Sequence, residues 1–151
     1  MKKILFLSLF GLFSLQAICQ INSGNYVIVS KINGKALDQD VSKNDAILWE
    51  KHNGDNQVWI VTAVDKGYYT IVSKINGKAL DQDISKGNAI VWEKHNGDNQ
   101  LWNIVANDKG YFTIVSKANG KALDQDMSKN DAILWEKHGG DNQQWQFTQL
   151  K

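Results

Sequence analysis

Residues 49–59 read Trp-Glu-Lys-His-Asn-Gly-Asp-Asn-Gln-Val-Trp, and this stretch returns at residues 92–102 and 135–145. The second copy ends Gln-Leu-Trp, and the third has Gly-Gly in place of Asn-Gly and ends Gln-Gln-Trp. Successive copies are 43 residues apart, and together they hold all six tryptophans of the protein. The chain therefore consists of three copies of one small unit, over about residues 23–65, 66–108 and 109–151.

Each unit contains four short segments that are typical of β-strands. Val, Ile, Tyr, Leu and Trp dominate these segments, which in the first unit are residues 24–30, 35–39, 46–50 and 57–61. Asn33-Gly34 stands between the first two, and Asn-Gly is the strongest short hairpin signal. No segment keeps a helical period, so the sequence predicts an all-β chain of twelve strands.

A unit of 43 residues is too small to bury its apolar face alone, so we expect three units to share one core. Twelve strands in three units predict a β-trefoil, a six-stranded barrel capped by three hairpins. A three-bladed propeller is the formal alternative, but propellers usually need four or more blades to close. The predicted core residues are Ile28, Leu37, Ile47, Trp59, Ile71, Leu80, Ile90, Trp102, Ile114, Leu123, Ile133 and Trp145.

Length and composition narrow the function classes. The 151 residues fit one domain, and no apolar run reaches the roughly 18 residues that a membrane-spanning helix needs. The chain has 17 lysines, no arginine and a net charge of +1. Arginine is the preferred side chain for phosphate and base edges, and phosphate backbones need a clustered positive face. The composition therefore argues against a nucleic-acid partner.

The N-terminal residues 1–19 resemble a secretory signal peptide. Met1-Lys2-Lys3 is positive, an apolar run follows, and Ala17-Ile18-Cys19 offers a cleavage site before Gln20. We expect a secreted protein whose mature chain, residues 20–151, is cysteine-free and forms a single domain. Lipid anchoring through Cys19 is an alternative, although Ile18 is bulky for that motif.

Three Gln-x-Trp motifs carry a family resemblance, one in each unit: Gln57-Val58-Trp59, Gln100-Leu101-Trp102 and Gln143-Gln144-Trp145. Gly-Lys-Ala-Leu-Asp precedes each motif by about twenty residues. The whole mature chain resembles the ricin-B-type (R-type) β-trefoil lectins, which implies carbohydrate binding. It differs from ricin in having no disulfides in its repeats and in the length of its loops between the aspartate and the Gln-x-Trp motif.

A sugar presents hydroxyl groups and a face of C–H groups, so its site needs a carboxylate or amide beside an aromatic ring. The resemblance implies an aspartate that accepts from sugar hydroxyls, an asparagine that donates, and a tryptophan that stacks. It further implies a glutamine that holds the aspartate and a histidine that adds a hydroxyl contact. The matching residues are Asp38, Trp49, His52, Asn56 and Gln57, then Asp81, Trp92, His95, Asn99 and Gln100, then Asp124, Trp135, His138, Asn142 and Gln143.

These residues also have purely structural interpretations. Trp49 could be a partly buried hairpin residue, Asp38 and Asn56 could only stabilise turns, and the histidines could be plain surface. All candidate residues are unchanged in the three units, whereas Asn44 is replaced by Gly87 in the second. A recent duplication would also leave such residues unchanged, so both interpretations stay open at this point.

Other function classes fit less well. Residues 38–43 begin like an EF-hand loop, but Lys43 replaces its glycine and Trp49 its bidentate glutamate, which leaves only a weaker calcium site open. Three equivalent copies without a unique nucleophile argue against an enzyme, and we expect no metal or cofactor. A protein-binding trefoil, of the inhibitor or cytokine type, is a further alternative.

The sequence therefore predicts a secreted lectin with three equivalent sugar sites, acting as a monomer or homodimer on glycans. By resemblance, galactose or N-acetylgalactosamine is the first expected sugar, and mannose-type glycans are the second.

Overall fold

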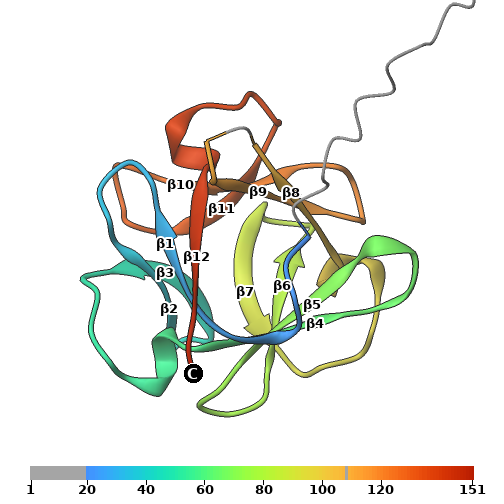
Figure 1. The fold of residues 1–151 in the computed structure, drawn as a ribbon, viewed down its shortest axis with the longest axis horizontal. Coiled ribbons are helices and arrows are strands. Elements are labelled where there is room, and N and C mark those ends of the chain that lie inside the picture. Colours follow the sequence, from blue (N-terminus) through green and yellow to red (C-terminus); the bar gives the residue numbers. More distant parts are fainter. Residues whose placement is uncertain (1–19, 108) are drawn as a thin grey trace, which may run out of the picture.

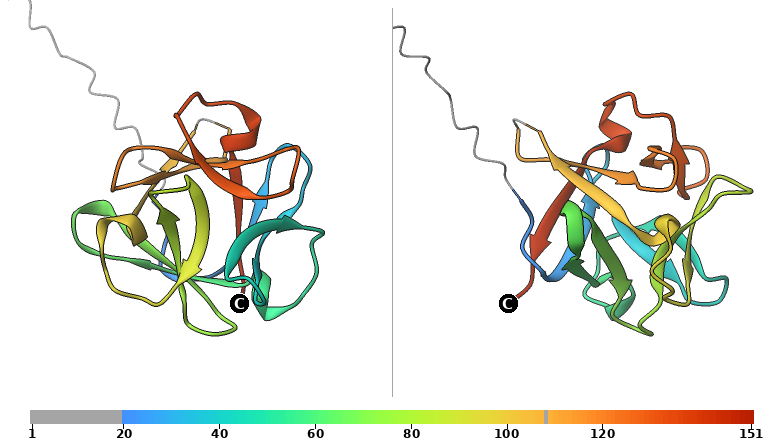
Figure 2. Two further views of the ribbon diagram at one scale, coloured as in Figure 1. Left: turned by 180° about the vertical axis from the view of Figure 1, so that it is seen from behind. Right: turned by 90° about the vertical axis from the view of Figure 1, so that its right-hand side faces the viewer.

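The computed structural model describes residues 20–107 and 109–151, and it forms the twelve predicted strands, four to each repeat (Figure 1). Six of them form a barrel: β1 (Gly24–Ser30), β4 (Trp59–Ala63), β5 (Tyr69–Ser73), β8 (Trp102–Ala106), β9 (Phe112–Ser116) and β12 (Trp145–Gln149). The other six form three hairpins: β2 (Ala36–Asp40) with β3 (Asp45–Trp49), β6 (Ala79–Asp83) with β7 (Asn88–Trp92), and β10 (Ala122–Gln125) with β11 (Ala132–Trp135). Seen from behind, the repeats lie around the centre as three lobes (Figure 2).

The barrel is closed, because every barrel strand pairs antiparallel with two others. The ring runs β1, β4, β5, β8, β9 and β12, and β12 then returns to β1. In that last pair Tyr26 lies opposite Gln149 and Ser30 lies opposite Trp145. The predicted β-trefoil is confirmed.

The three hairpins are joined to one another at one end of the barrel. Asp45 at the start of β3 lies opposite Ile90 of β7, and Asn88 of β7 lies opposite Ile133 of β11. Asp131 completes the ring opposite Ile47 of β3. Each hairpin therefore places its tip beside the outer face of a neighbouring repeat, so that neighbouring repeats meet at three equivalent positions.

The shared core contains most of the residues predicted for it. The second tryptophan of each Gln-x-Trp motif is fully buried at 0% exposure, and its Nε1 donates to the main-chain oxygen of the leucine before the aspartate, at 2.9 Å in Trp59 and Leu37. The prediction was wrong for one position in each repeat: Ile47, Ile90 and Ile133 are only half-buried, and Leu48, Val91 and Leu134 fill the core instead. Successive side chains of a strand point to opposite faces, so the burial of Leu48 turns Ile47 outward.

Local structure agrees with the turn signals and differs at one strand start. Gly34 has a φ of 74°, a left-handed conformation that glycine adopts readily, and its N–H donates to the main-chain oxygen of Ser30 at 2.9 Å. Gln57 was expected to begin the fourth strand, but it ends the short 3-10 helix η1 (Asp55–Gln57), and β4 starts at Trp59. The same 3-10 turn recurs as η3 (Asp98–Gln100) and η4 (Asp141–Gln143), and a further one, η2 (Asp65–Gly67), precedes β5.

The predicted signal peptide, residues 1–19, and the alternative lipid-anchor residue Cys19 lie outside the described residues. Within residues 20–107 and 109–151, none of the helices has the length and apolar character needed to cross a membrane. The domain boundaries stay a prediction.

Candidate functional site

The candidate residues of the first and second repeats meet at a hollow, and those of the third repeat make the same hydrogen bonds to one another. Asp38 comes from β2 and Trp49 from β3, while the 3-10 turn η1 brings Asn56 to the same place. The hollow in the first repeat has a volume of about 420 Å³, and Asp38, Trp49, His52 and Asn56 line it. The fold therefore brings together residues of one repeat that come from two strands and a turn.

The aspartate lies at the base of the hollow and is held by two amides. Asp38 is only 3% exposed, and its Oδ1 and Oδ2 accept hydrogen bonds from Asn56 Nδ2 and Gln57 Nε2, each at 2.7 Å. Asp81 and Asp124 have the same pair of donors at 2.7 to 2.8 Å. A carboxylate oxygen accepts about two hydrogen bonds, so both oxygens keep capacity for a further donor.

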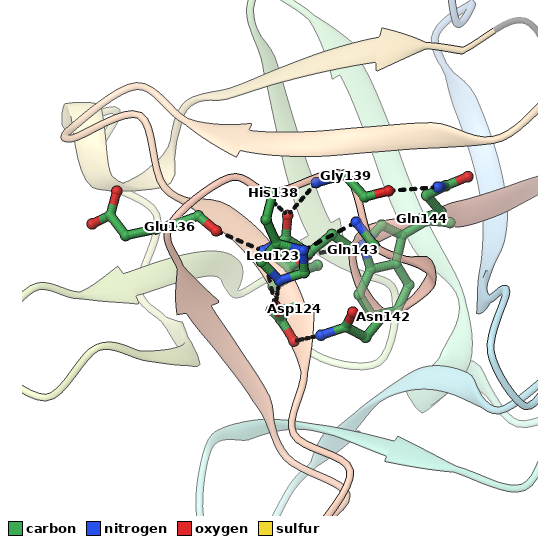
Figure 3. Close-up of polar contacts among 10 residues, drawn as sticks. Leu123, Asp124, Glu136, His138, Gly139, Asn142, Gln143 and Gln144 are labelled. Atoms are coloured by element: carbon green, nitrogen blue, oxygen red, sulfur yellow. Dashed lines mark hydrogen bonds and ion pairs between the residues drawn. The ribbon is translucent and has the colours of Figure 1, made fainter.

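The glutamine connects three parts of the site and is fully buried. Gln57 Nε2 donates to Asp38 and to the main-chain oxygen of Glu50 at 2.9 Å, while its Oε1 accepts from the His52 N–H at 2.8 Å. Figure 3 shows the same network in the third repeat, where Gln143 joins Asp124, Glu136 and His138. This glutamine fixes the carboxylate and the loop before the 3-10 turn in one arrangement, as the resemblance implied.

The histidine is oriented by the main chain. His52 Nδ1 accepts from the Gly54 N–H at 2.9 Å, so in the neutral ring the proton lies on Nε2. That Nε2 is 3.4 Å from Asp38 Oδ2, and the histidine side chain is partly exposed. Gly54 has no space for a side chain here, because a Cβ would lie 2.6 Å from Asn56 Oδ1 and 2.7 Å from His52 Cε1.

The first tryptophan of each copy is exposed. Trp49, Trp92 and Trp135 have exposed fractions of 56%, 53% and 57%. The alternative of partly buried hairpin residues therefore does not hold for them. A large ring left open to solvent beside an oriented carboxylate provides an apolar surface next to a hydrogen-bonding group.

Two apolar residues of the hollow were missed by the sequence prediction. Ile47 was expected in the core, and Val41 was not among the predicted site residues, yet both line the first hollow, and Ile90 and Ile84 line the second. The signal that places Ile47 was present, since Asp45, Ile47 and Trp49 alternate along one face of β3.

The second hollow also includes the tip of a neighbouring hairpin. It has a volume of about 550 Å³, and its lining residues are Asp81, Gln82, Asp83, Ile84, Lys86, Ile90, Trp92, His95 and Asn99 of its own repeat with Lys43, Asn44 and Asp45 of the first repeat. The sequence did not predict this contribution from a neighbouring repeat.

A second carboxylate borders each of the two hollows, Asp40 in the first and Asp83 in the second, and Asp126 is its equivalent in the third repeat. A hydrogen bond from the Ser42 hydroxyl, at 2.6 Å, holds the pKa of Asp40 below its ordinary value. The hydroxyls of Ser85 and Ser128 lower the pKa values of Asp83 and Asp126 in the same way. These carboxylates therefore stay ionised to lower pH than a free aspartate would.

Among the residues that the structure describes, His, Asp and Glu side chains form no group of three or more that could hold a metal ion. The weaker calcium site considered from the sequence is therefore left to a direct test.

With this geometry established, comparisons with known proteins decide the family. The family model described as "Ricin-type beta-trefoil lectin domain-like" matches residues 13–91, 55–133 and 98–151. The chain belongs to this ricin-type β-trefoil lectin-like family. No curated protein sequence matches the chain.

Solved structures agree with this membership of the lectin-like family. The designed threefold-symmetric protein ThreeFoil is 34% identical with a TM-score of 0.79, covering 84% of this chain and 99% of its own. The Polyporus squamosus lectin bound to Neu5Aca2-6Galb1-4GlcNAc is 23% identical, with a TM-score of 0.76, and the match covers 86% of this chain and 50% of that one. SeviL bound to asialo-GM1 saccharide is 22% identical, with a TM-score of 0.73 and coverage of 86% and 100%. The last two share the fold.

Proposed function

We propose that this protein is a secreted, non-enzymatic lectin that binds glycans through its three repeats. The observation that carries the proposal is the exposed tryptophan beside a buried carboxylate that two amides hold in place. Trp49 is 56% exposed while Asp38 is 3% exposed, and both line the same hollow. Val41 and Ile47 lie with Trp49 around the same hollow, and exposed apolar surface that is contiguous and bordered by polar groups is typical of a binding site.

In the proposed mode of binding, the sugar lies with its C–H face against Trp49 and two neighbouring hydroxyls toward Asp38. The carboxylate accepts from these hydroxyls, and the second N–H of the Asn56 amide donates to one of them. His52 Nε2 donates to a further hydroxyl, since its proton is placed there by the bond from Gly54. Ile47 and Val41 border the hollow as apolar contacts.

Such open, shallow sites bind single sugars weakly, and we attribute useful affinity to multivalency. Three sites on one rigid barrel convert later contacts into near-intramolecular ones, so avidity can exceed the affinity of one site by about 10²–10⁴. Galactose or N-acetylgalactosamine is the first proposed sugar, on the R-type resemblance, and mannose-type glycans are the second.

The test is a glycan array probed with the purified protein from residue 20 onward, which contains all twelve strands, with and without EDTA. We expect binding to a defined group of glycans, with terminal galactosides foremost, and no change with EDTA. Loss of binding in EDTA would indicate that glycan binding needs a bound calcium ion. A blank array from a folded protein would contradict the lectin proposal and favour a protein-binding trefoil.

A further inference from the structure

The three sites are not chemically equal, because each one borders the hairpin tip of a neighbouring repeat and these tips differ. Asp45 lies opposite Ile90 and lines the hollow that contains Asp81. In the same register, Asp131 lies opposite Ile47 in the first site and Asn88 lies opposite Ile133 in the third. Residues directly opposite each other in antiparallel strands have Cβ atoms roughly 5 Å apart. Asp45 is among the lining residues of the second hollow, and the shared register places Asp131 beside Ile47 and Asn88 beside Ile133 at the border of the other two sites.

The residue at this tip position changes the charge around one site. The first and second sites face a carboxylate, Asp131 or Asp45, whereas the third faces the neutral amide of Asn88. All three tips have a lysine two residues before this position, which is Lys43, Lys86 or Lys129. All three sites also have their aspartate, which is Asp38, Asp81 or Asp124. The third site therefore has one negative charge fewer at its border than the other two.

A second difference also makes the surroundings of the third site more favourable to an anion than those of the other two sites. Lys35 and Lys78 donate to the side-chain oxygens of Asn130 and Asn44 at 2.8 and 3.0 Å. The equivalent lysine of the third site is Lys121, and the equivalent tip residue is Gly87, which has no side chain to accept this bond. The Lys121 side chain is accordingly 36% exposed, against 23% for Lys35 and 26% for Lys78.

We propose that the third site, around Asp124 and Trp135, accepts glycans that carry a carboxylate or sulfate group, whereas Asp45 and Asp131 disfavour such glycans at the other two sites. This inference rests on the proposed lectin function and adds a ligand class to one site of it. An anionic substituent that extends from the third site past Ile133 meets Asn88 and the more exposed ammonium of Lys121. This ammonium is 3.6 Å from the exposed Glu136 carboxylate, a neighbour that Lys35 and Lys78 have equally in Glu50 and Glu93. At the equivalent point of the other sites such a substituent meets a carboxylate and a lysine that already has an amide partner.

The repeats themselves supply matched substitutions for a test. Asn88→Asp gives the third site the residue that the other two have, and the Asp45→Asn/Asp131→Asn double variant gives those two sites the amide. Each change copies a residue found at the same position of another repeat, so the fold accommodates it. The probe is an array that carries neutral glycans beside their sialylated and sulfated forms, and the readout is the ratio of anionic to neutral binding.

We expect Asn88→Asp to lower this ratio roughly two- to fivefold at low ionic strength, the size of one added charge at a solvated site. The double variant raises the ratio by a similar factor, and high salt removes both effects through screening. In a Trp135→Ala background, where the third site is disabled, Asn88→Asp leaves the ratio unchanged.

An unchanged ratio in both tip variants would overturn the inference while leaving the lectin function intact. An effect of Asn88→Asp that persists with Trp135→Ala would show that the tip does not act on the third site, which also overturns it. A folded wild-type protein that binds no glycan on the array would overturn the lectin proposal, and this inference with it.

Discussion

The two tryptophans of each repeat occur equally often and are equally unchanged, yet the structure gives them opposite environments. Trp59 is fully buried and donates its N–H to Leu37 inside the barrel, while Trp49 is 56% exposed on the outer face of a hairpin. Repetition alone therefore does not distinguish a residue that holds the fold from one that is available to a ligand. Burial makes that distinction, and it does so in the same way in all three repeats.

The strongest test of this contrast is the stability of two alanine variants. Trp59→Ala should lower the free energy of unfolding by about 3–5 kcal/mol, because it empties a core position and removes the partner of the Leu37 carbonyl. Trp49→Ala should change it by less than about 0.5 kcal/mol, as expected for an exposed side chain. Chemical denaturation of both variants measures the difference, and similar losses would remove the distinction between the two tryptophans.

Binding should show the reverse order. Replacing Trp49, Trp92 and Trp135 together by alanine should reduce binding to a glycan surface by about 10²–10⁴, since the avidity of three sites is lost with the rings. The circular dichroism spectrum and the unfolding midpoint should stay close to wild type. Surface plasmon resonance on the array's best glycan measures the loss, and wild-type binding by this variant would rule out stacking on these rings.

Gln57 lies between the two tryptophan environments and should affect both properties. Gln57→Ala removes the bonds to Asp38, Glu50 and His52, and should cost about 1–3 kcal/mol of stability because buried groups lose their partners. Asn56→Ala is the matched control, because it removes one partly exposed bond to the same carboxylate. If the control were the more destabilising of the two, Gln57 would not be the residue that holds the site together.

The smallest expected effect concerns the border carboxylates. Ser42→Ala removes the hydroxyl that lowers the pKa of Asp40, so the pKa of this carboxyl should rise toward its ordinary value of 3.8. In the wild type the lowered pKa stabilises the fold above pH 3.8, and this contribution disappears as the pH falls through the folded-state pKa. The variant should therefore be slightly less stable at neutral pH and equal to wild type in strong acid, and NMR titration of the Asp40 carboxyl measures the shift.

Much of the fold was predictable because the period of 43 residues, the Asn-Gly turns and the Gln-x-Trp motifs are all local signals. Ile47 was misplaced because it lies within the apolar run Ala-Ile-Leu-Trp, where only the polar Asp45 two residues before it indicates that its face of the strand is the outer one. The contribution of Asp45 to the second site was missed for another reason. It depends on a pairing between different repeats, and no local pattern in the sequence indicates that register.

The pairing of β1 with β12 has a consequence for how the protein is made. Tyr26 pairs with Gln149, so the barrel closes only after β12 has been synthesised. Contacts so distant in sequence slow folding, and until then both edges of the growing sheet remain available to other strands. A chain cut short after β11 would lose one of the two barrel partners of β1 and of β9 together. Without β12 the nascent chain is an open sheet with edges prone to aggregation, and with β12 the barrel is closed.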